Sequence, residues 1–227
     1  MTKNGPSSKT RSFTVGVLFI ATTISLFLHI DLPNTGAEPQ DKLTQIEHWL
    51  PPRDGEEWTK HDVAGFIFQF EGFESDLYLD NRPIGHLTIG VGHLVEKEPM
   101  TIYQYLAIRP GGKYAKWEEM TDDELIDLYY SDLEYAYKII DRYVDVRLAS
   151  NERAALVSLA YNWGYLTTAK FEGGETLIDM INRHAPINLI ENAWMYPVTA
   201  GSSEVLPGLV KRRKAELTLF MSTWRNR

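Results

Sequence analysis

Residues 70–95, FEGFESDLYLDNRPIGHLTIGVGHLV, are the segment that most constrains the fold of this chain. They follow an apolar stripe whose i, i+3, i+4 and i+7 spacing predicts a helix, made by Val63, Phe66, Ile67 and Phe70. Gly72 is positioned to end that helix, because glycine adopts a left-handed C-terminal cap without strain. Gly90 and Gly92 alternate along the strand that follows, which indicates close approach of backbone or ligand. The segment therefore predicts a helix followed by one small β-hairpin.

The chain after residue 95 is predicted to be mostly helical. Thr121 and Glu124 have capping-box spacing ahead of a helical apolar pattern over 125–143. Ser150 is a candidate N-cap for a helix over 154–163, which Gly164 would end. Three further patterns predict helices over 175–183, 186–195 and 210–224, the second opened by its proline. One small hairpin among many helices is an α+β fold that is predominantly α.

Composition and charge exclude several classes of function. The 227 residues suffice for one domain plus an appendage, or for two small lobes. The chain has no cysteine, so disulfides, thiol catalysis and cysteine zinc sites are excluded. The net charge is −8, and residues 1–30 contain three basic residues and no acid, so the remainder carries −11. Such an acidic body argues against nucleic acid as a partner.

Residues 13–30 form an uncharged stretch of 18 residues, FTVGVLFIATTISLFLHI. As a helix it would span about 27 Å, which is just enough for a bilayer core. Lys9 and Arg11 precede it and favour an N-terminus that stays inside the cell. Three export interpretations remain open: a cleaved signal peptide with its cleavage site at 35–37, a permanent signal anchor, or a weak anchor that can leave the membrane. A buried helix of a soluble protein is the fourth. The export interpretations place residues 38–227 outside the cytoplasm.

Residues 31–58 are expected to be a linker between that segment and a folded domain at 59–227. The stretch contains four prolines among scattered charges, at positions 33, 39, 51 and 52. One short helical turn is predicted around 43–50.

Glu71 is the leading candidate for a catalytic group. It lies at i+8 on the stripe that begins at Val63, so it shares the face of the buried residues. A carboxylate in the last turn of a helix opposes the helix dipole, and a neighbour such as Phe70 removes solvent from it. Loss of solvation favours the protonated carboxyl, the form that a general acid requires. The alternative is an exposed glutamate at a helix end.

Asp80 and Thr88 are the other two candidates in the hairpin. Asp80 opens the turn-forming sequence DNRPIG, so it either shapes the turn or stays ionised there as a second carboxylate. Two carboxyls in different environments suit glycoside hydrolysis, in which one protonates the leaving oxygen and the other assists water or steadies the cationic sugar. Thr88 begins the sequence TIGVGH. Its Gly-x-Gly is no dinucleotide signature, because the place of the third glycine is held by Val95.

Metals and cofactors are not expected. His86 and His93 have no metal-binding spacing with other ligands. His93 is interpreted as a hydrogen-bonded structural residue.

Three ordered motifs resemble phage-type lysozymes, glycoside hydrolase family 24. They are Glu71-Gly72 with Tyr78, Asp80 and the run 88–93; RAALVSLAYNWG at 153–164; and PGLVKRRKAELTLF at 207–220. The resemblance covers roughly residues 60–224. The separation of eight positions between Asp80 and Thr88 is longer than in the usual hairpin of the family, and Arg82-Pro83 is the expected insertion.

The resemblance implies a lysozyme-like two-lobed fold, with a small β-hairpin lobe, a helical lobe and the substrate cleft between them. It implies cleavage of the β-1,4 bond between N-acetylmuramic acid and N-acetylglucosamine in peptidoglycan. Glu71 would be the general acid, Asp80 would position water or stabilise the transition state, and Thr88 would complete the environment of that water.

Two supporting residues follow from the same resemblance. Arg212 would pair with Glu71, and Asn162 would form hydrogen bonds inside the cleft. Without the resemblance, Arg212 is interpreted as an exposed charge of the last helix. Asn162 is interpreted equally well as a buried amide near the helix end at Gly164.

The biological role has several candidate forms. The leading one is an exported phage endolysin, acting as a monomer on peptidoglycan and held at the inner membrane through residues 13–30. A bacterial or secretion-system muramidase would use the same chemistry. A catalytically inactive wall-binding module is a different class, against which the intact Glu71, Asp80 and Thr88 argue. A pore-forming holin would need more membrane segments than this chain offers.

Overall fold

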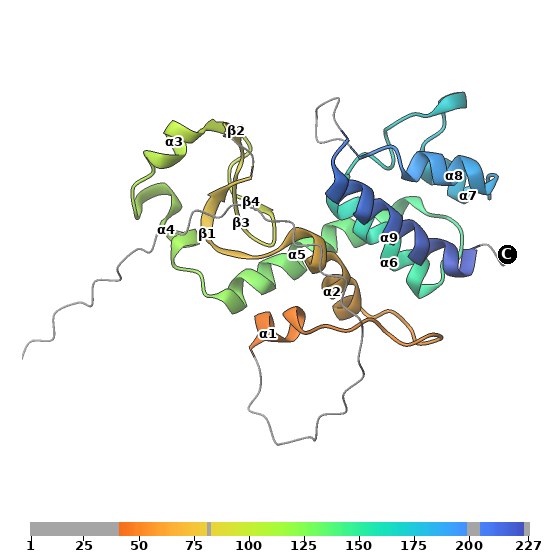
Figure 1. Cartoon of the computed structure of the whole chain (residues 1–227), viewed down its shortest axis with the longest axis horizontal. Coiled ribbons are helices and arrows are strands. Elements are labelled where there is room, and N and C mark those ends of the chain that lie inside the picture. Colours follow the sequence, from red (N-terminus) through yellow and green to blue (C-terminus); the bar gives the residue numbers. More distant parts are fainter. Residues whose placement is uncertain (1–40, 81–82, 199–204, 225–227) are drawn as a thin grey trace, which may run out of the picture. The chain divides into compact units, whose positions relative to one another are not determined.

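The computed structural model describes residues 41–80, 83–198 and 205–224 (Figure 1). All of the described residues belong to one compact unit, Pro39–Arg227. Residues 13–30 and Arg82 of the expected insertion therefore lie outside the described residues. Within the described ranges, no helix has the length and apolar character needed to cross a membrane.

This unit is built of α-helices with a few short strands. The helices are α1 (Lys42–Glu47), α2 (Lys60–Glu71), α3 (Ile102–Leu106), α4 (Ala115–Glu118), α5 (Asp122–Tyr143), α6 (Ser150–Asn162), α7 (Leu177–Asn182), α8 (Ile187–Trp194) and α9 (Pro207–Trp224). The strands are β1 (Glu74–Leu79), β2 (Ile84–Gly85), β3 (Leu87–Gly90), β4 (His93–Leu94) and β5 (Met100–Thr101). Short 3₁₀ turns occupy Gly112–Tyr114 and Glu172–Gly174.

The strands form the predicted hairpin and a small extension of it. The order β1-β3-β4 is antiparallel, and Thr88 of β3 lies opposite Tyr78 on one side and Leu94 on the other. An irregularity in the register falls between Glu74 and Tyr78. A separate antiparallel pair joins β2 to β5.

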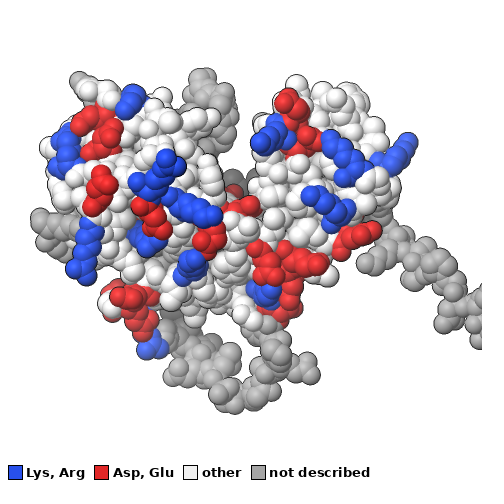
Figure 2. Space-filling model, turned by 180° about the vertical axis from the view of Figure 1, so that it is seen from behind, with Lys and Arg blue, Asp and Glu red and all other residues white. Residues whose placement is uncertain are grey.

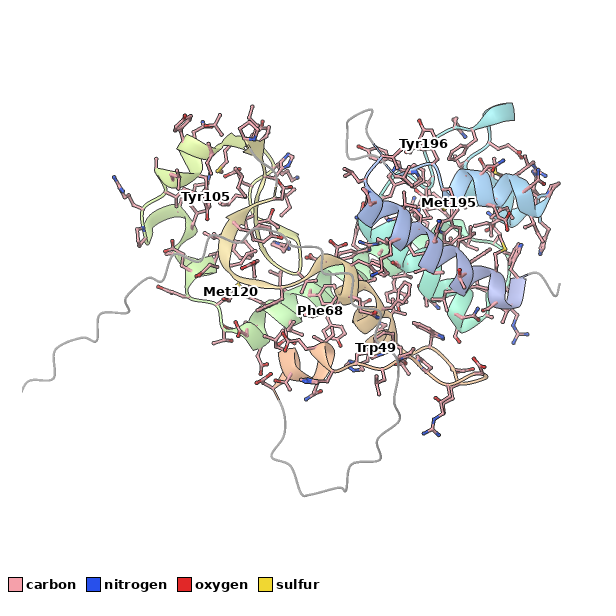
Figure 3. The ribbon with its side chains drawn as sticks, in the orientation of Figure 1. Trp49, Phe68, Tyr105, Met120, Met195 and Tyr196 are labelled. Atoms are coloured by element: carbon pink, nitrogen blue, oxygen red, sulfur yellow. The ribbon has the colours of Figure 1, made fainter. Side chains whose placement is uncertain are left out.

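Two apolar cores underlie this arrangement. The larger core takes residues from α1, α2 and α5 to α9, whereas the smaller one consists of Leu79, Leu87 and Met100 with partly buried neighbours. Tyr105 of α3 closes the smaller core by donating a hydrogen bond to the carbonyl of Leu77, at 2.9 Å (Figure 3). Helix α5 contacts both β3 and α6, and so joins the strands to the other helices (Figure 1). The predicted α+β fold, predominantly α, with a small β lobe and a helical lobe, is confirmed.

The end of α2 and the start of α5 lie where their sequences predict. Thr59 and Asp62 form a reciprocal capping box at the start of α2. Gly72 ends it with φ of 75°, and its N–H donates to the carbonyl of Phe68 at 3.1 Å. The capping box of Thr121 and Glu124 is present at the start of α5. These ends matter because Gly72 fixes Glu71 as the last residue of α2.

Other helix ends differ from the predictions. Helix α6 begins at Ser150 rather than after it, because the Ser150 hydroxyl accepts a hydrogen bond from the N–H of Trp58, at 3.0 Å, instead of capping. The carboxylate of Glu152 binds the N–H of Ala149 there, at 2.8 Å. Pro186 is the N-cap of α8 and not its first residue. Helix α9 begins earlier than residue 210, at Pro207.

The folded unit also begins earlier than residue 59. Residues 42–47 of the expected linker form α1, which packs against α2 and α5 and buries Ile46. The N–H of Lys42 binds a carboxylate oxygen of Asp123 at 2.8 Å. Trp49 lies against α2 (Figure 3), and its indole N–H donates to Asp62 at 3.0 Å. The segment contains no long helix, yet apolar packing and these hydrogen bonds hold it against the body.

Gly65 of α2 provides a test of that packing. A methyl group at this position would overlap the ring of Trp49. We expect Gly65→Ala to lower the free energy of unfolding by about 1–3 kcal/mol, because an overpacked contact must shift. Urea denaturation followed by tryptophan fluorescence measures the change. Gly208→Ala is the matched control, since nothing lies within 4 Å of its added methyl, and its stability should be unchanged or slightly raised. A wild-type midpoint for Gly65→Ala would show that Trp49 does not rest on α2.

Candidate active site

Glu71 lies at the C-terminal end of α2, and only one of its two carboxylate oxygens accepts a hydrogen bond from the described residues. Its side chain is 20% exposed, and Oε1 accepts a hydrogen bond from Nη1 of Arg212. Among the described residues, none donates a hydrogen bond to Oε2. A methyl group at Gly92 would lie 3.7 Å from Oε2, so the turn between β3 and β4 passes close beside it. Glu71 therefore presents an oxygen that is close to the hairpin backbone and is unoccupied by the described chain.

Arg212 of α9 is buried and is held through three nitrogens. Besides the contact with Glu71, Nε donates to Oε1 of Glu216 at 3.0 Å, and Nη2 donates to the carbonyl of Ser158 at 3.2 Å. The guanidinium carbon lies 5.5 Å from the ring centre of Phe70. Burial lowers the pKa of Arg212, but the carboxylates of Glu71 and Glu216 outweigh it and raise the pKa above its usual value. The predicted partner of Glu71 is thus in contact with it, as a fixed cation rather than an exposed charge.

Arg213 extends this cluster toward Asn162, the last residue of α6. Its Nη2 donates to Oδ1 of Asn162, and its Nη1 lies 2.8 Å from Oε2 of Glu216 in an ion contact without hydrogen-bond geometry. Oε1 of Glu216 also accepts from the Ser158 hydroxyl at 2.6 Å. Burial, with only partial compensation from Glu216, lowers the pKa of Arg213 to about 10, so it remains a cation at neutral pH.

Asp80 closes the hairpin just after β1. Its N–H donates to the carbonyl of His86 at 3.1 Å, and its Oδ1 accepts from the N–H of His86 at 2.6 Å. Its side chain is 41% exposed, and Nδ1 of His86 lies 3.5 Å from Oδ2. Asp80 therefore shapes the turn and still presents a carboxylate oxygen to solvent.

Thr88 lies inside the hairpin, opposite Tyr78, and its side chain is buried. Its hydroxyl donates to the carbonyl of His86 at 3.1 Å. The hydroxyl proton is engaged in this bond, so the oxygen is left as an acceptor. The same carbonyl binds the N–H of Asp80, so His86 connects Thr88 to Asp80.

Tyr78 experiences the charges of both carboxylates. Burial raises the pKa of Tyr78 to about 12, and the negative charges of Glu71 and Asp80 add to this effect. Both carboxylates therefore act on the one phenol.

His93 has a structural position at the edge of the sheet. Its Nδ1 lies 2.8 Å from a carboxylate oxygen of Asp132 in α5, and its ring centre is 5.1 Å from that of Trp117 in α4. It thereby ties β4 to two helices. No group of three or more His, Asp or Glu side chains suited to a metal ion occurs in the described part of the chain.

Three members of the buried cluster, Ser158, Arg213 and Glu216, were not singled out from the sequence. One signal was available. Arg212, Glu216 and Phe220 recur at i, i+4 and i+8, so the two charged residues share a helix face with a core phenylalanine. Oppositely charged residues on an apolar face indicate a buried ion pair.

Comparison with known families decides the assignment. Residues 68–216, more than half of the chain, match the phage lysozyme family. The chain belongs to this family. No curated protein matches its sequence. Family membership makes the chain a peptidoglycan hydrolase of the lysozyme type, and the matched range includes all six candidate residues named above.

Solved structures share the fold of this chain. The muramidase domain of SpmX from Asticaccaulis excentricus is 22% identical, with a TM-score of 0.52 over 74% of this chain and 99% of that domain. The active form of the P1 phage endolysin Lyz is 20% identical, with a TM-score of 0.51 over 70% of this chain and 83% of the endolysin. The endolysin of Escherichia coli O157:H7 phage FAHEc1 is 19% identical, with a TM-score of 0.52 over 74% of this chain and 96% of that endolysin.

Proposed function

We propose that this chain is a muramidase that cleaves the β-1,4 bond between N-acetylmuramic acid and N-acetylglucosamine, with Glu71 as the general acid. The contact that carries the proposal is the one between Arg212 and Oε1 of Glu71. It fixes the carboxyl and leaves Oε2 free to carry a proton to the leaving oxygen of a glycosidic bond. Figure 2 shows a notch in the surface with acidic atoms at its base, which is a suitable place for a glycan strand.

The proposed roles of Asp80 and Thr88 follow from their positions in the hairpin. Asp80 has an exposed oxygen that can orient water or stabilise positive charge on the sugar. The Thr88 oxygen can accept a hydrogen bond from that water, because its own proton is directed to His86. Asn162, held by Arg213, would bind the substrate from the helical side.

Product analysis tests the reaction. Purified peptidoglycan is digested with the full-length chain, reduced with borohydride and analysed by mass spectrometry. A muramidase exposes N-acetylmuramic acid at the new reducing end, so fragments ending in reduced muramic acid are expected. Fragments ending in reduced N-acetylglucosamine would reject the proposed bond, and wall binding without fragments would support the inactive binding module.

Asp80→Asn separates the catalytic role of Asp80 from its role in the turn. The amide oxygen can still accept from the N–H of His86, so the hairpin should close, but the negative charge is lost. We expect the rate of peptidoglycan hydrolysis to fall by about 10²-fold or more, with an unchanged melting temperature. Asp76→Asn, an exposed position in β1, is the matched control and should retain activity. Full activity in Asp80→Asn, with loss in Asp76→Asn, would show that the wrong carboxylate had been assigned.

The proposed biological role is that of a phage endolysin acting outside the cytoplasm. Two of the similar solved structures are titled endolysins, which supports this role. The third is titled the muramidase domain of SpmX from Asticcacaulis excentricus, which supports the alternative. The uncharged residues 13–30 with their basic flank support export. A holin gene beside the coding sequence would favour the phage role.

Removal of residues 1–37 tests the export proposal. We expect the shortened chain to hydrolyse purified peptidoglycan yet to remain in the cytoplasm without lysing the cells, because the segment that directs export is gone. Cell fractionation measures this, together with sequencing of the N-terminus of the exported full-length chain. A new N-terminus at Glu38 would select the cleaved signal peptide over an anchor. Full-length chain found only in the cytosol would reject export.

A further inference from the structure

We propose that Glu216 is a positioning residue that controls how readily Glu71 releases its proton, by offsetting the charge of the two buried arginines behind it. This inference rests on the proposed role of Glu71 as the general acid. It adds a function for a residue that touches neither the exposed surface nor Glu71 itself.

The geometry places Glu216 between the two arginines. Its Oε1 accepts from Nε of Arg212 at 3.0 Å, and its Oε2 lies 2.8 Å from Nη1 of Arg213. The side chain of Glu216 is fully buried, as is that of Arg213, and the side chain of Arg212 is 3% exposed. Water is therefore excluded from the ion pairs, and the charges interact with little screening.

The Glu216 carboxylate thus holds two arginines in place, and each arginine contacts a residue that is proposed to face the substrate. Arg212 contacts Glu71, and Arg213 contacts Asn162. The Ser158 hydroxyl supplies a further hydrogen bond to Glu216, so the carboxylate has a single orientation between α6 and α9.

The charge balance gives Glu216 its effect on the proton. Two guanidinium groups and one carboxylate leave a net charge of +1 behind Glu71. If the Glu216 charge were removed, two cations would face Glu71 and would stabilise its ionised form, which cannot donate a proton. Among the described residues, Glu71 also interacts with three phenols from β1, α5 and α6, which are uncharged at neutral pH: Tyr78, Tyr129 and Tyr161. Three further carboxylates act on these phenols: Asp80 and Glu74 on Tyr78, and Asp132 on Tyr161.

A titration of Glu71 tests this balance directly. The full-length chain is labelled with ¹³C-glutamate, and the Glu71 carboxyl signal is identified by its absence in Glu71→Gln. In Glu216→Gln, which keeps the shape but removes the charge, the midpoint of the Glu71 titration should fall by about one pH unit. In Arg213→Met it should rise by a similar amount, because the net charge behind Glu71 becomes zero.

The double variant Arg213→Met with Glu216→Gln makes the test specific for charge. Its net charge behind Glu71 is again +1, so the midpoint should return to that of the wild type. Comparison of Arg213→Met with the double variant isolates the Glu216 charge even if Glu216→Gln alone fails to fold. Equal midpoints in that pair would overturn the inference, and so would an unchanged midpoint in folded Glu216→Gln.

Glu152→Gln is the matched control. Glu152 is also a fully buried glutamate near the contact of α6 with α9, where it accepts from the Thr223 hydroxyl at 2.7 Å. Its substitution should cost stability without moving the Glu71 midpoint, and a shift as large as that of Glu216→Gln would overturn the inference. Hydrolysis of peptidoglycan is measured separately, and an inactive wild-type chain would reject the proposed function. The role of Glu216 is decided only by the order of the Glu71 titration midpoints among these variants.

Discussion

Glu71→Gln is expected to abolish hydrolysis of purified peptidoglycan while leaving the fold intact. The amide cannot deliver a proton to the leaving oxygen, and loss of a positioned acid costs about 10²–10⁴-fold in rate. The amide oxygen can still accept a hydrogen bond from Nη1 of Arg212, so α2 should keep its contact with α9. The measurement is the rate of release of reducing ends, with circular dichroism to verify folding.

Glu74→Gln is a control for this substitution, because Glu74 is an exposed carboxylate three positions further along, in β1. It should keep wild-type turnover. A folded Glu71→Gln chain that cleared peptidoglycan at the wild-type rate would exclude Glu71 as the acid.

Arg212→Ala should lose both stability and activity. The substitution removes the hydrogen bonds that Arg212 donates to Glu216 and to the carbonyl of Ser158, and it frees the side chain of Glu71. Breaking a buried ion pair typically lowers the free energy of unfolding by about 3–5 kcal/mol. Thermal and urea denaturation measure the loss, and peptidoglycan hydrolysis measures the effect on the acid.

Lys214→Ala is the matched control, because Lys214 is an exposed residue of the same helix. Its effect should stay within about 0.5 kcal/mol. If Arg212→Ala matched this control in both melting temperature and turnover, the arginine would be no more than a surface charge.

The helices were predictable where local sequence determines them. The stripe that begins at Val63, the glycine at position 72 and the capping box at Thr121 act over a few residues, and each gave the correct element. Ser150 shows the limit of such signals. It has the chemistry of an N-cap, but its hydroxyl is used by Trp58, which is 92 positions away in the sequence.

The packing of α1 could not be predicted for the same reason. A short segment rich in proline reads as a linker, and only the tertiary contacts of Ile46 and Trp49 decide that it folds onto the body. In the site, the apolar stripe of the helix indicated Glu71, and the family resemblance indicated Arg212. The contact of Glu216 with both arginines depends on the rotamers of three long side chains. The helical periodicity of the sequence carries no information on rotamers.

The paired hydrogen bonds between Asp80 and His86 have a consequence for how this enzyme could diversify. They fasten the base of the hairpin tip, and the carbonyl of Pro83 is bound by the N–H of Ile102 at 2.9 Å on the far side. Residues gained between Asp80 and Pro83 would therefore lengthen this segment, and residues lost would shorten it, without displacing the Asp80 carboxylate or Thr88. Natural drift or a designed library could therefore vary the length of this segment while the two proposed catalytic residues, Asp80 and Thr88, stay in register.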